Sequence, residues 1–138
     1  MSREAFLLTP IGTVRSRLTR LEGAPRQGDE GGPEAWIELS TDVALGLDGI
    51  APGDELIVLT WLHRADRGVL EVHPRGNLSA PLTGVFATRS PDRPNPIGLH
   101  RVTVLGIEGT RLEVAPIEAI DGTPVVDIKP VLGDPTER

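Results

Sequence analysis

The sequence predicts a mainly β fold: a small, antiparallel, barrel-like domain of about eight short strands with one or two short helices. Frequent apolar runs of strand length and a high content of glycine and proline support this prediction. Apolar runs of strand length recur along the chain and are separated by turn-forming residues, with 16 glycines and 13 prolines among 138 residues. The chain contains no cysteine, which excludes disulfides and thiolate zinc sites. A chain of this length can bury a core of its own, so residues 1–138 are expected to form a single domain.

The first strand is expected over residues 6–14, where Pro10 indicates an edge strand or a bulge because proline cannot donate a backbone hydrogen bond. Residues 15–33 are polar and contain several glycines and prolines, which predicts a long loop. Long loops within a compact domain are often functional. A short strand with alternating apolar residues is expected next, over residues 36–39.

Residues 40–42 (Ser-Thr-Asp) offer N-caps for a short helix over residues 43–47. The strongest apolar run, residues 55–62, should be a central strand. The remaining strands are expected at residues 68–73, 84–88, 97–107, 111–115 and 125–128, with a loop at 74–81 and turns at 108–109 and 121–124.

The most unusual stretch is GVFATRSPDRPNPIGL at residues 84–99, where an expected strand is followed by a proline-rich loop, here called the signature loop (residues 89–96). Pro91, Pro94 and Pro96 remove backbone donors, fix φ angles and restrict the residues before them. Such a loop loses little conformational entropy on binding. Two arginines, an aspartate and an asparagine among the prolines suit a charged or polar ligand better than they suit a plain turn.

The three histidines, His63, His73 and His100, have no spacing that suits metal ligation, so no metal site is predicted. His73 and His100 are interpreted as ordinary strand residues. His63 stands with Arg64 at the end of the expected central strand, which favours a place in a binding site. No glycine-rich G-x-G-x-x-G motif follows a strand, so the residues by themselves do not indicate a dinucleotide-type cofactor site.

The net charge of −6 conceals two basic segments. Residues 13–27 contain four arginines against one glutamate, and residues 60–101 contain six arginines against three acidic residues, so each segment has a net charge of +3 and the remainder −12. Basic charge therefore lies with the signature loop, a pattern that permits an anionic substrate. No apolar run is long enough to span a membrane and no signal peptide is recognised, so a soluble, cytoplasmic protein is expected.

Three strings occur in the order and at the approximate separations found in a known family. They are RSPDRPNPIG at the signature loop, DGTPVVDIKP at residues 121–130, and Pro25-Arg26-Gln27 after an opening PIGTVRS. On these strings nearly the whole chain resembles the TrmO family, also called YaeB or TsaA-like, of S-adenosylmethionine-dependent tRNA methyltransferases. The resemblance implies a small β-barrel and not the Rossmann sheet of most methyltransferases, in agreement with the strand pattern.

The resemblance also implies S-adenosyl-L-methionine as the cofactor, bound near a homodimer interface. Arg89 or Arg26 would hold its carboxylate by a charge-assisted pair, turn amides would contact the adenine edge, and Leu99 would pack on it. Carried over motif by motif, the cofactor-binding candidates are Pro25, Arg26, Gln27, His63, Arg64, Arg89, Leu99, Asp121, Gly122, Thr123 and Pro124.

The family reaction moves a methyl group to the exocyclic amine of a threonylcarbamoyl-modified adenosine beside the tRNA anticodon. Positioning of the reactants and acceptors for the amine hydrogens would supply most of the catalysis. By analogy with amine methyltransferases that use an Asn/Asp-Pro-Pro-aromatic loop, Asn95 is the candidate for such an acceptor, and Arg93 is the other catalytic candidate. The arginines expected to contact tRNA are Arg17, Arg20 and Arg67.

Many family members carry an additional C-terminal domain, and this extension is expected to be absent here because the sequence stops soon after Pro130. Together with the net acidity, this leaves alternatives open. One is a methyltransferase that acts on a small molecule or on a different RNA. The other is a non-catalytic β-barrel that binds a nucleotide or metabolite, and methyl transfer into tRNA would separate the two classes.

Overall fold

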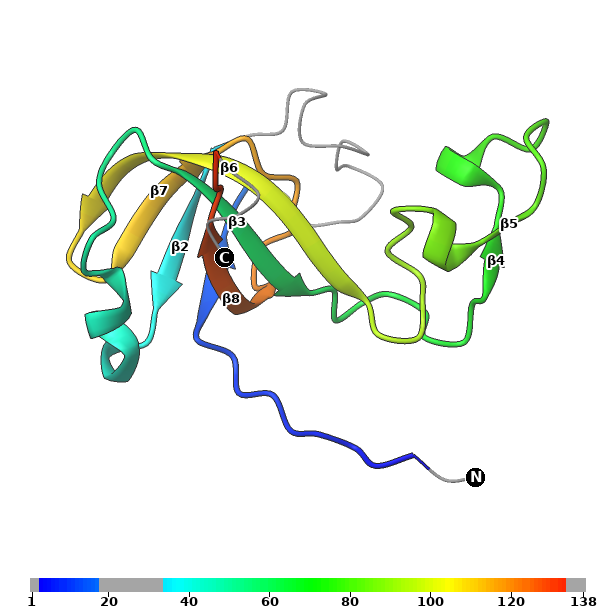
Figure 1. Cartoon of the computed structure of the whole chain (residues 1–138), viewed down its shortest axis with the longest axis horizontal. Coiled ribbons are helices and arrows are strands. Elements are labelled where there is room, and N and C mark those ends of the chain that lie inside the picture. The colour runs from blue at the N-terminus through cyan, green and yellow to red at the C-terminus, as the bar shows by residue number, and fades with distance from the viewer. Residues whose placement is uncertain (1–2, 18–33, 134–138) are drawn as a thin grey trace.

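The computed structural model describes residues 3–17 and 34–133. Six strands form one antiparallel sheet in the order β1–β2–β7–β6–β3–β8, which closes into a barrel because β8 pairs with β1 as well as with β3 (Figure 1). The six strands are β1 (Gly12–Arg15), β2 (Ala35–Leu39), β3 (Glu55–Trp61), β6 (Ile97–Glu108), β7 (Arg111–Ala115) and β8 (Pro124–Pro130). The prediction of a mainly β, barrel-like fold is confirmed.

Apolar side chains fill the barrel because successive residues of a strand point to opposite faces of the sheet. On β3, for example, Leu56, Val58 and Thr60 are buried, and the residues between them are partly exposed. The buried apolar cluster consists of Val14, Ala35, Ile37, Leu39, Leu56, Val58, Val102, Val104, Leu112, Val114, Ile117, Ala119 and Val125.

The alternating strand directions bring the ends of β1, β3 and β7 together with the beginnings of β2, β6 and β8. This end of the barrel is called the motif end, because the signature loop, the chain after β3 and the turn before β8 all connect there. At the opposite end lies the 3₁₀ helix η3 (Thr41–Leu47), from which Val43 and Leu47 pack against the core. Topology alone therefore gathers most of the sequence-predicted site at one end.

Several expected elements are confirmed. β3 is present and lies between β6 and β8 in the barrel, where every strand has a neighbour on each side, and β6 and β7 form the expected hairpin. The expected helix is present as η3, but Ser40 makes no side-chain cap there. Among the residues that the structure describes, no helix is both long and apolar enough to cross a membrane.

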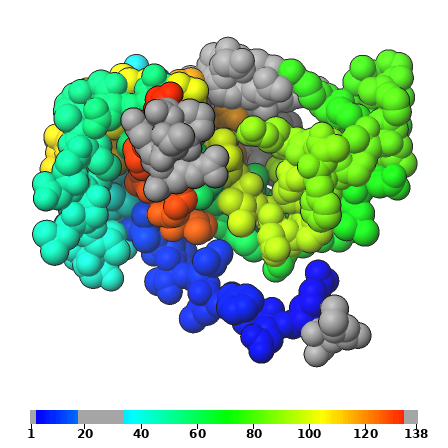
Figure 2. Space-filling view, in the orientation of Figure 1, coloured from blue at the N-terminus to red at the C-terminus, as the bar shows by residue number. Residues whose placement is uncertain are grey.

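The expectation of a strand over residues 6–14 is wrong for most of its length. β1 begins only at Gly12, and the preceding segment projects from the barrel as an arm (Figures 1 and 2). Phe6 and Leu7 are 85% and 93% exposed, because no neighbouring strand lies beside them within the described residues. The apolar composition of this segment therefore predicted a strand, but most of the segment pairs with no strand and stays exposed.

The strands expected at 68–73 and 84–88 are also wrong in extent. Only β4 (Glu71–Val72) and β5 (Thr83–Gly84) pair, as a separate two-stranded sheet in a lobe beside the barrel (Figure 1). The 3₁₀ turn η4 (Pro74–Gly76) lies between them, and β5 is followed at once by the 3₁₀ turn η5 (Val85–Ala87). Of the three residues of η5 only Val85 is buried, so a longer strand would gain no further core contact here.

Candidate functional site

The signature loop is fastened to the chain that follows β3. The amide of Leu62 donates to the carbonyl of Pro96 at 2.8 Å, and the amide of Asp66 donates to Oδ1 of Asp92 at 2.8 Å. Arg67 adds two hydrogen bonds to the same loop, from Nε to the carbonyl of Pro94 at 2.7 Å and from Nη2 to Oδ1 of Asn95 at 3.0 Å. The loop that proline stiffens from within is thus also held from outside.

Arg93 holds the other side of the loop. Its guanidinium donates to the carbonyls of Thr88 and Ser90, each at 3.1 Å, and to that of Val85 at 2.5 Å. These three bonds join the start of the signature loop to η5. The structure therefore gives Arg93 a bridging position inside the loop, and the catalytic role expected for it stays a prediction.

Arg67 lies in a similar bridging position. Besides its two bonds to the signature loop, its guanidinium carbon lies 5.2 Å from the ring centroid of Trp61, within the range of a cation–π contact. Sequence reasoning assigned Arg67 to tRNA phosphates; here its Nε and Nη2 hold the signature loop, and the phosphate contact stays a prediction. The long separation between Arg67 and Asn95, 28 residues, explains why no local pattern revealed this contact.

The other predicted site residues of this region lie on the surface. His63, Arg64, Arg89 and Asn95 are exposed, on the chain after β3 and on the signature loop. Arg89 makes no hydrogen bond or ion pair with any described residue, so its guanidinium is available to a ligand. Leu99 lies on the outer face of β6, is 47% exposed, and pairs across the sheet with Leu59.

Inside the barrel, just behind the signature loop, Thr60 and His100 form a buried hydrogen bond of 2.9 Å between Oγ1 and Nε2. Burial lowers the pKa of His100 from 6.5 to about 4, so the ring is neutral at physiological pH. Gly98 makes room for this pair, since a Cβ at that position would collide with Oγ1 of Thr60. The expectation of an ordinary strand position for His100 holds, but sequence reasoning missed the pair.

The second part of the motif end is the turn before β8. The amide of Thr123 donates to the carbonyl of Ile120, and Gly122 has φ +87°, as the third residue of a type II turn requires. Oδ1 of Asp121 accepts from the amide of Ser16 at 3.1 Å, and the amide of Gly122 donates to Val14. The expected turn at residues 121–124 is thus tied to the end of β1.

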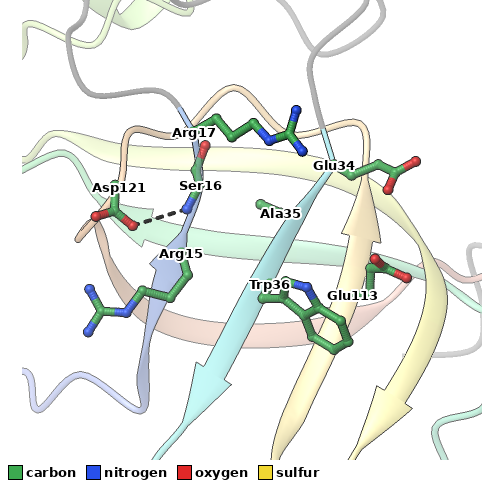
Figure 3. Close-up of a pocket in the computed structure, with 8 residues that line it drawn as sticks. All are labelled: Arg15, Ser16, Arg17, Glu34, Ala35, Trp36, Glu113 and Asp121. Carbon is green, nitrogen blue, oxygen red and sulfur yellow. Dashed lines mark hydrogen bonds between the residues drawn. The ribbon is translucent and has the colours of Figure 1, made fainter.

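A pocket of about 710 Å³ opens beside this turn, on the outer face of β1, β2 and β7 (Figure 3). Three acidic side chains, Glu34, Glu113 and Asp121, line the pocket together with the candidate tRNA contact Arg17. The full lining is Arg15, Ser16, Arg17, Glu34, Ala35, Trp36, Glu113 and Asp121. In a strand whose residues alternate between the two faces of the sheet, the outward-facing positions, such as Trp36, are the sequence signal that could have indicated this side of the pocket.

The described candidates therefore form two groups at one end of the barrel. His63, Arg64 and Arg89 lie with the signature loop, and Asp121 lies at the pocket with Arg17. Within the described residues no cluster of three histidine, cysteine or acidic side chains could hold a metal ion. Pro25, Arg26, Gln27 and Arg20 lie outside the described residues.

Comparison with known proteins places this site in context. The family model described as the tRNA-methyltransferase O N-terminal domain matches residues 13–134. Among curated relatives, a probable S-adenosyl-L-methionine-binding protein of Methanothermobacter thermautotrophicus is 41% identical over 134 residues, covering 97% of this chain and 96% of the relative. An S-adenosyl-L-methionine-binding protein of Archaeoglobus fulgidus is 44% identical over 124 residues, covering 90% and 88%.

The fold is also similar to solved structures. The crystal structure of TrmO from Pseudomonas aeruginosa matches with a TM-score of 0.74 and 30% identity, covering 98% of this chain and 62% of that one. A second TrmO crystal structure gives a TM-score of 0.76 at 30% identity, covering 100% and 62%. This chain thus spans less than two thirds of the length of the solved TrmO chains.

Proposed function

Since the chain belongs to the tRNA-methyltransferase O (TrmO) family, we propose that it uses S-adenosyl-L-methionine to methylate tRNA. The acceptor is the exocyclic amine of a threonylcarbamoyl-modified adenosine beside the anticodon. The proposal rests on one structural observation above the others: two of the three family strings, at the signature loop and at the turn before β8, meet at the motif end, where the signature loop is held from both sides.

The residues at the motif end fit this cofactor chemically. Arg89, exposed and without a described partner, suits the carboxylate of the methionine part, because a guanidinium binds a carboxylate through two parallel hydrogen bonds. Asp121 and Glu34 at the pocket offer oxygen acceptors for ribose hydroxyls or for an ammonium group. Leu99, half-exposed on β6, offers an apolar surface to a purine ring.

Bound S-adenosyl-L-methionine would supply an electrophilic methyl group. The lone pair of the amine nitrogen would form the new bond to the methyl carbon while the carbon–sulfur bond breaks. The electron pair of the broken bond would stay on sulfur, and the nitrogen would lose a proton to solvent. The protein has to hold the two reactants in line and exclude competing orientations. A preorganised loop suits that task, since it needs no reordering when the reaction occurs. Asn95 is the side chain of this loop that would contact the acceptor base.

A homodimer would reconcile the two groups of site residues. In one chain, Arg89 on the signature loop and Asp121 at the pocket share no contact among the described residues. The outer face of β6 carries exposed apolar residues, Ile97 at 43% and Leu99 at 47%, beside the signature loop. Contact between two such faces would cover apolar surface and bring a partner's residues toward this loop.

Methyl transfer tests the proposal directly. Purified protein is incubated with total tRNA and S-adenosyl-L-methionine labelled on the methyl group, and the tRNA is digested for nucleoside analysis. Label in a methylated threonylcarbamoyl-adenosine is the expected result. Label in another nucleoside would refute threonylcarbamoyl-adenosine as the acceptor. Cofactor binding without label in any RNA would favour the alternative of a non-catalytic binding protein. The Asn95→Ala protein should bind cofactor and tRNA but turn over more slowly.

A further inference from the structure

The contact between Arg67 and Asn95 fixes which way the asparagine amide faces. An arginine side chain has only hydrogen-bond donors, so the Asn95 atom that faces Nη2 of Arg67 at 3.0 Å must be the carbonyl oxygen Oδ1. The backbone carbonyl of Asn95 is also engaged, because it accepts from the amide of Ile97 at 2.7 Å. The side-chain NH₂ group therefore points away from Arg67, on an exposed residue.

Arg67 is itself well fixed. Its Nε holds the carbonyl of Pro94 at 2.7 Å while Nη2 holds Asn95, and its guanidinium stacks near Trp61. Two donors of one planar group thus hold two consecutive residues of the signature loop. The flanking Pro94 and Pro96 remove most of the remaining backbone freedom of Asn95.

We propose that Arg67 is a positioning residue that orients Asn95 so that its NH₂ group donates to a hydrogen-bond acceptor of the substrate base. This inference rests on the proposed function. It reverses the role expected from the sequence, in which Asn95 accepts from the amine that is methylated. A ring nitrogen or a carbonyl oxygen of the bound nucleoside is the partner that this donor suits.

Asn95→Asp distinguishes the two roles. A carboxylate keeps an oxygen toward Arg67 and strengthens the pair, but it has no hydrogen to donate. If Asn95 is a donor, Asn95→Asp lowers methyl transfer to tRNA about 10- to 100-fold, as Asn95→Ala does, while affinity for S-adenosylhomocysteine is unchanged. If Asn95 is an acceptor, Asn95→Asp retains most of the activity, and the proposal is overturned.

A double-mutant cycle tests the positioning. Arg67→Ala alone should lower kcat about 10-fold or more, but in the Asn95→Ala background it should have almost no further effect, because Arg67 acts through Asn95. Additive losses would show that Arg67 acts independently, for example on a phosphate. Arg67→Lys should recover little activity. A single ammonium nitrogen cannot reproduce the planar geometry in which Nε and Nη2 each hold one oxygen.

The matched control is Arg111→Ala. Arg111 makes the same kind of stack, 4.3 Å from the centroid of Trp36 in the pocket lining, but its backbone begins β7 at the opposite end of the barrel, and its ion pair is with Glu38 and not with the signature loop. Amide hydrogen exchange should accelerate in the signature loop of Arg67→Ala and stay unchanged in that of Arg111→Ala. Equal exchange in the wild type, Arg67→Ala and Arg111→Ala would refute the positioning of the signature loop by Arg67. This measurement needs no substrate. Absence of tRNA methylation in the wild type would therefore refute the proposed function, while hydrogen exchange would still test whether Arg67 positions the signature loop.

Discussion

At the scale of single residues, a buried histidine makes the stability of this fold depend on pH. His100 is 8% exposed, hydrogen-bonded to Thr60, and its pKa is lowered from 6.5 to about 4 by burial. Between these two values the unfolded chain binds a proton that the folded chain does not, so stability increases with pH across this window. The contribution is fully present above about pH 6.5 and is lost as pH falls through 4.

We expect the free energy of unfolding of the wild type to fall by about 3 kcal/mol more than that of His100→Gln between pH 7 and pH 4. Glutamine can keep a hydrogen bond to Thr60 but does not titrate in this range. Urea unfolding at several pH values measures the difference. Parallel curves for the two proteins would show that His100 does not titrate in this way.

Arg89 is the residue on which cofactor affinity should depend most. Loss of a hydrogen-bonded charge partner costs about 1.5–3 kcal/mol, so Arg89→Ala should weaken binding of S-adenosylhomocysteine roughly 10- to 100-fold. Isothermal calorimetry gives the affinity of both proteins. An unchanged dissociation constant would remove Arg89 from the site.

At the scale of elements, the beginning of β6 depends on Gly98. A Cβ there would collide with Oγ1 of Thr60 and lie 2.9 Å from Nε2 of His100, so the buried pair would have to separate. Gly98→Ala should therefore lower stability by about 1–3 kcal/mol. Gly46→Ala in η3 is the control, because no atom lies within 4 Å of a Cβ there, and its effect should stay within about 0.5 kcal/mol. Equal midpoints of thermal unfolding would contradict the steric argument.

At the scale of the whole molecule, we expect a homodimer. The exposed apolar side chains on β6 and the separation of the two groups of site residues both favour an assembly in which two chains complete the site. Light scattering at micromolar concentration should give twice the monomer mass of 14.8 kDa. A monomer mass together with full methyl transfer would exclude this assembly as a requirement for activity.

The arginines of the motif end should make tRNA binding depend on salt. Affinity should fall with a log–log slope of about −0.7 to −0.9 for each phosphate neutralised. Arg17→Ala should weaken tRNA binding and reduce the slope by about one such unit, with cofactor affinity unchanged. Binding that does not depend on salt would instead favour a small-molecule substrate. The nearby Glu34 and Asp121 limit how strongly this part of the surface attracts phosphates.

The sequence by itself determined most of the barrel strands, the rigidity of the signature loop and, through three strings, the family. These features depend on residues close together in the chain, since the alternation of apolar residues reports burial and proline limits its own backbone. For the same reason the sequence misjudged residues 6–14, where an apolar segment finds no neighbouring strand in the described residues.

Only the tertiary structure decided the partners of the long side chains. Arg67, expected to contact phosphates, also holds Asn95, while Arg93 holds the carbonyls of Val85 and Thr88 as well as that of Ser90 in its own loop. His100 was expected on a strand, but its buried bond to Thr60 appears only when β3 and β6 pair. The contacts of Arg67 and of His100 join residues that the pairing of β3 with β6 brings together, so the register between distant strands, which no local pattern contains, determines them.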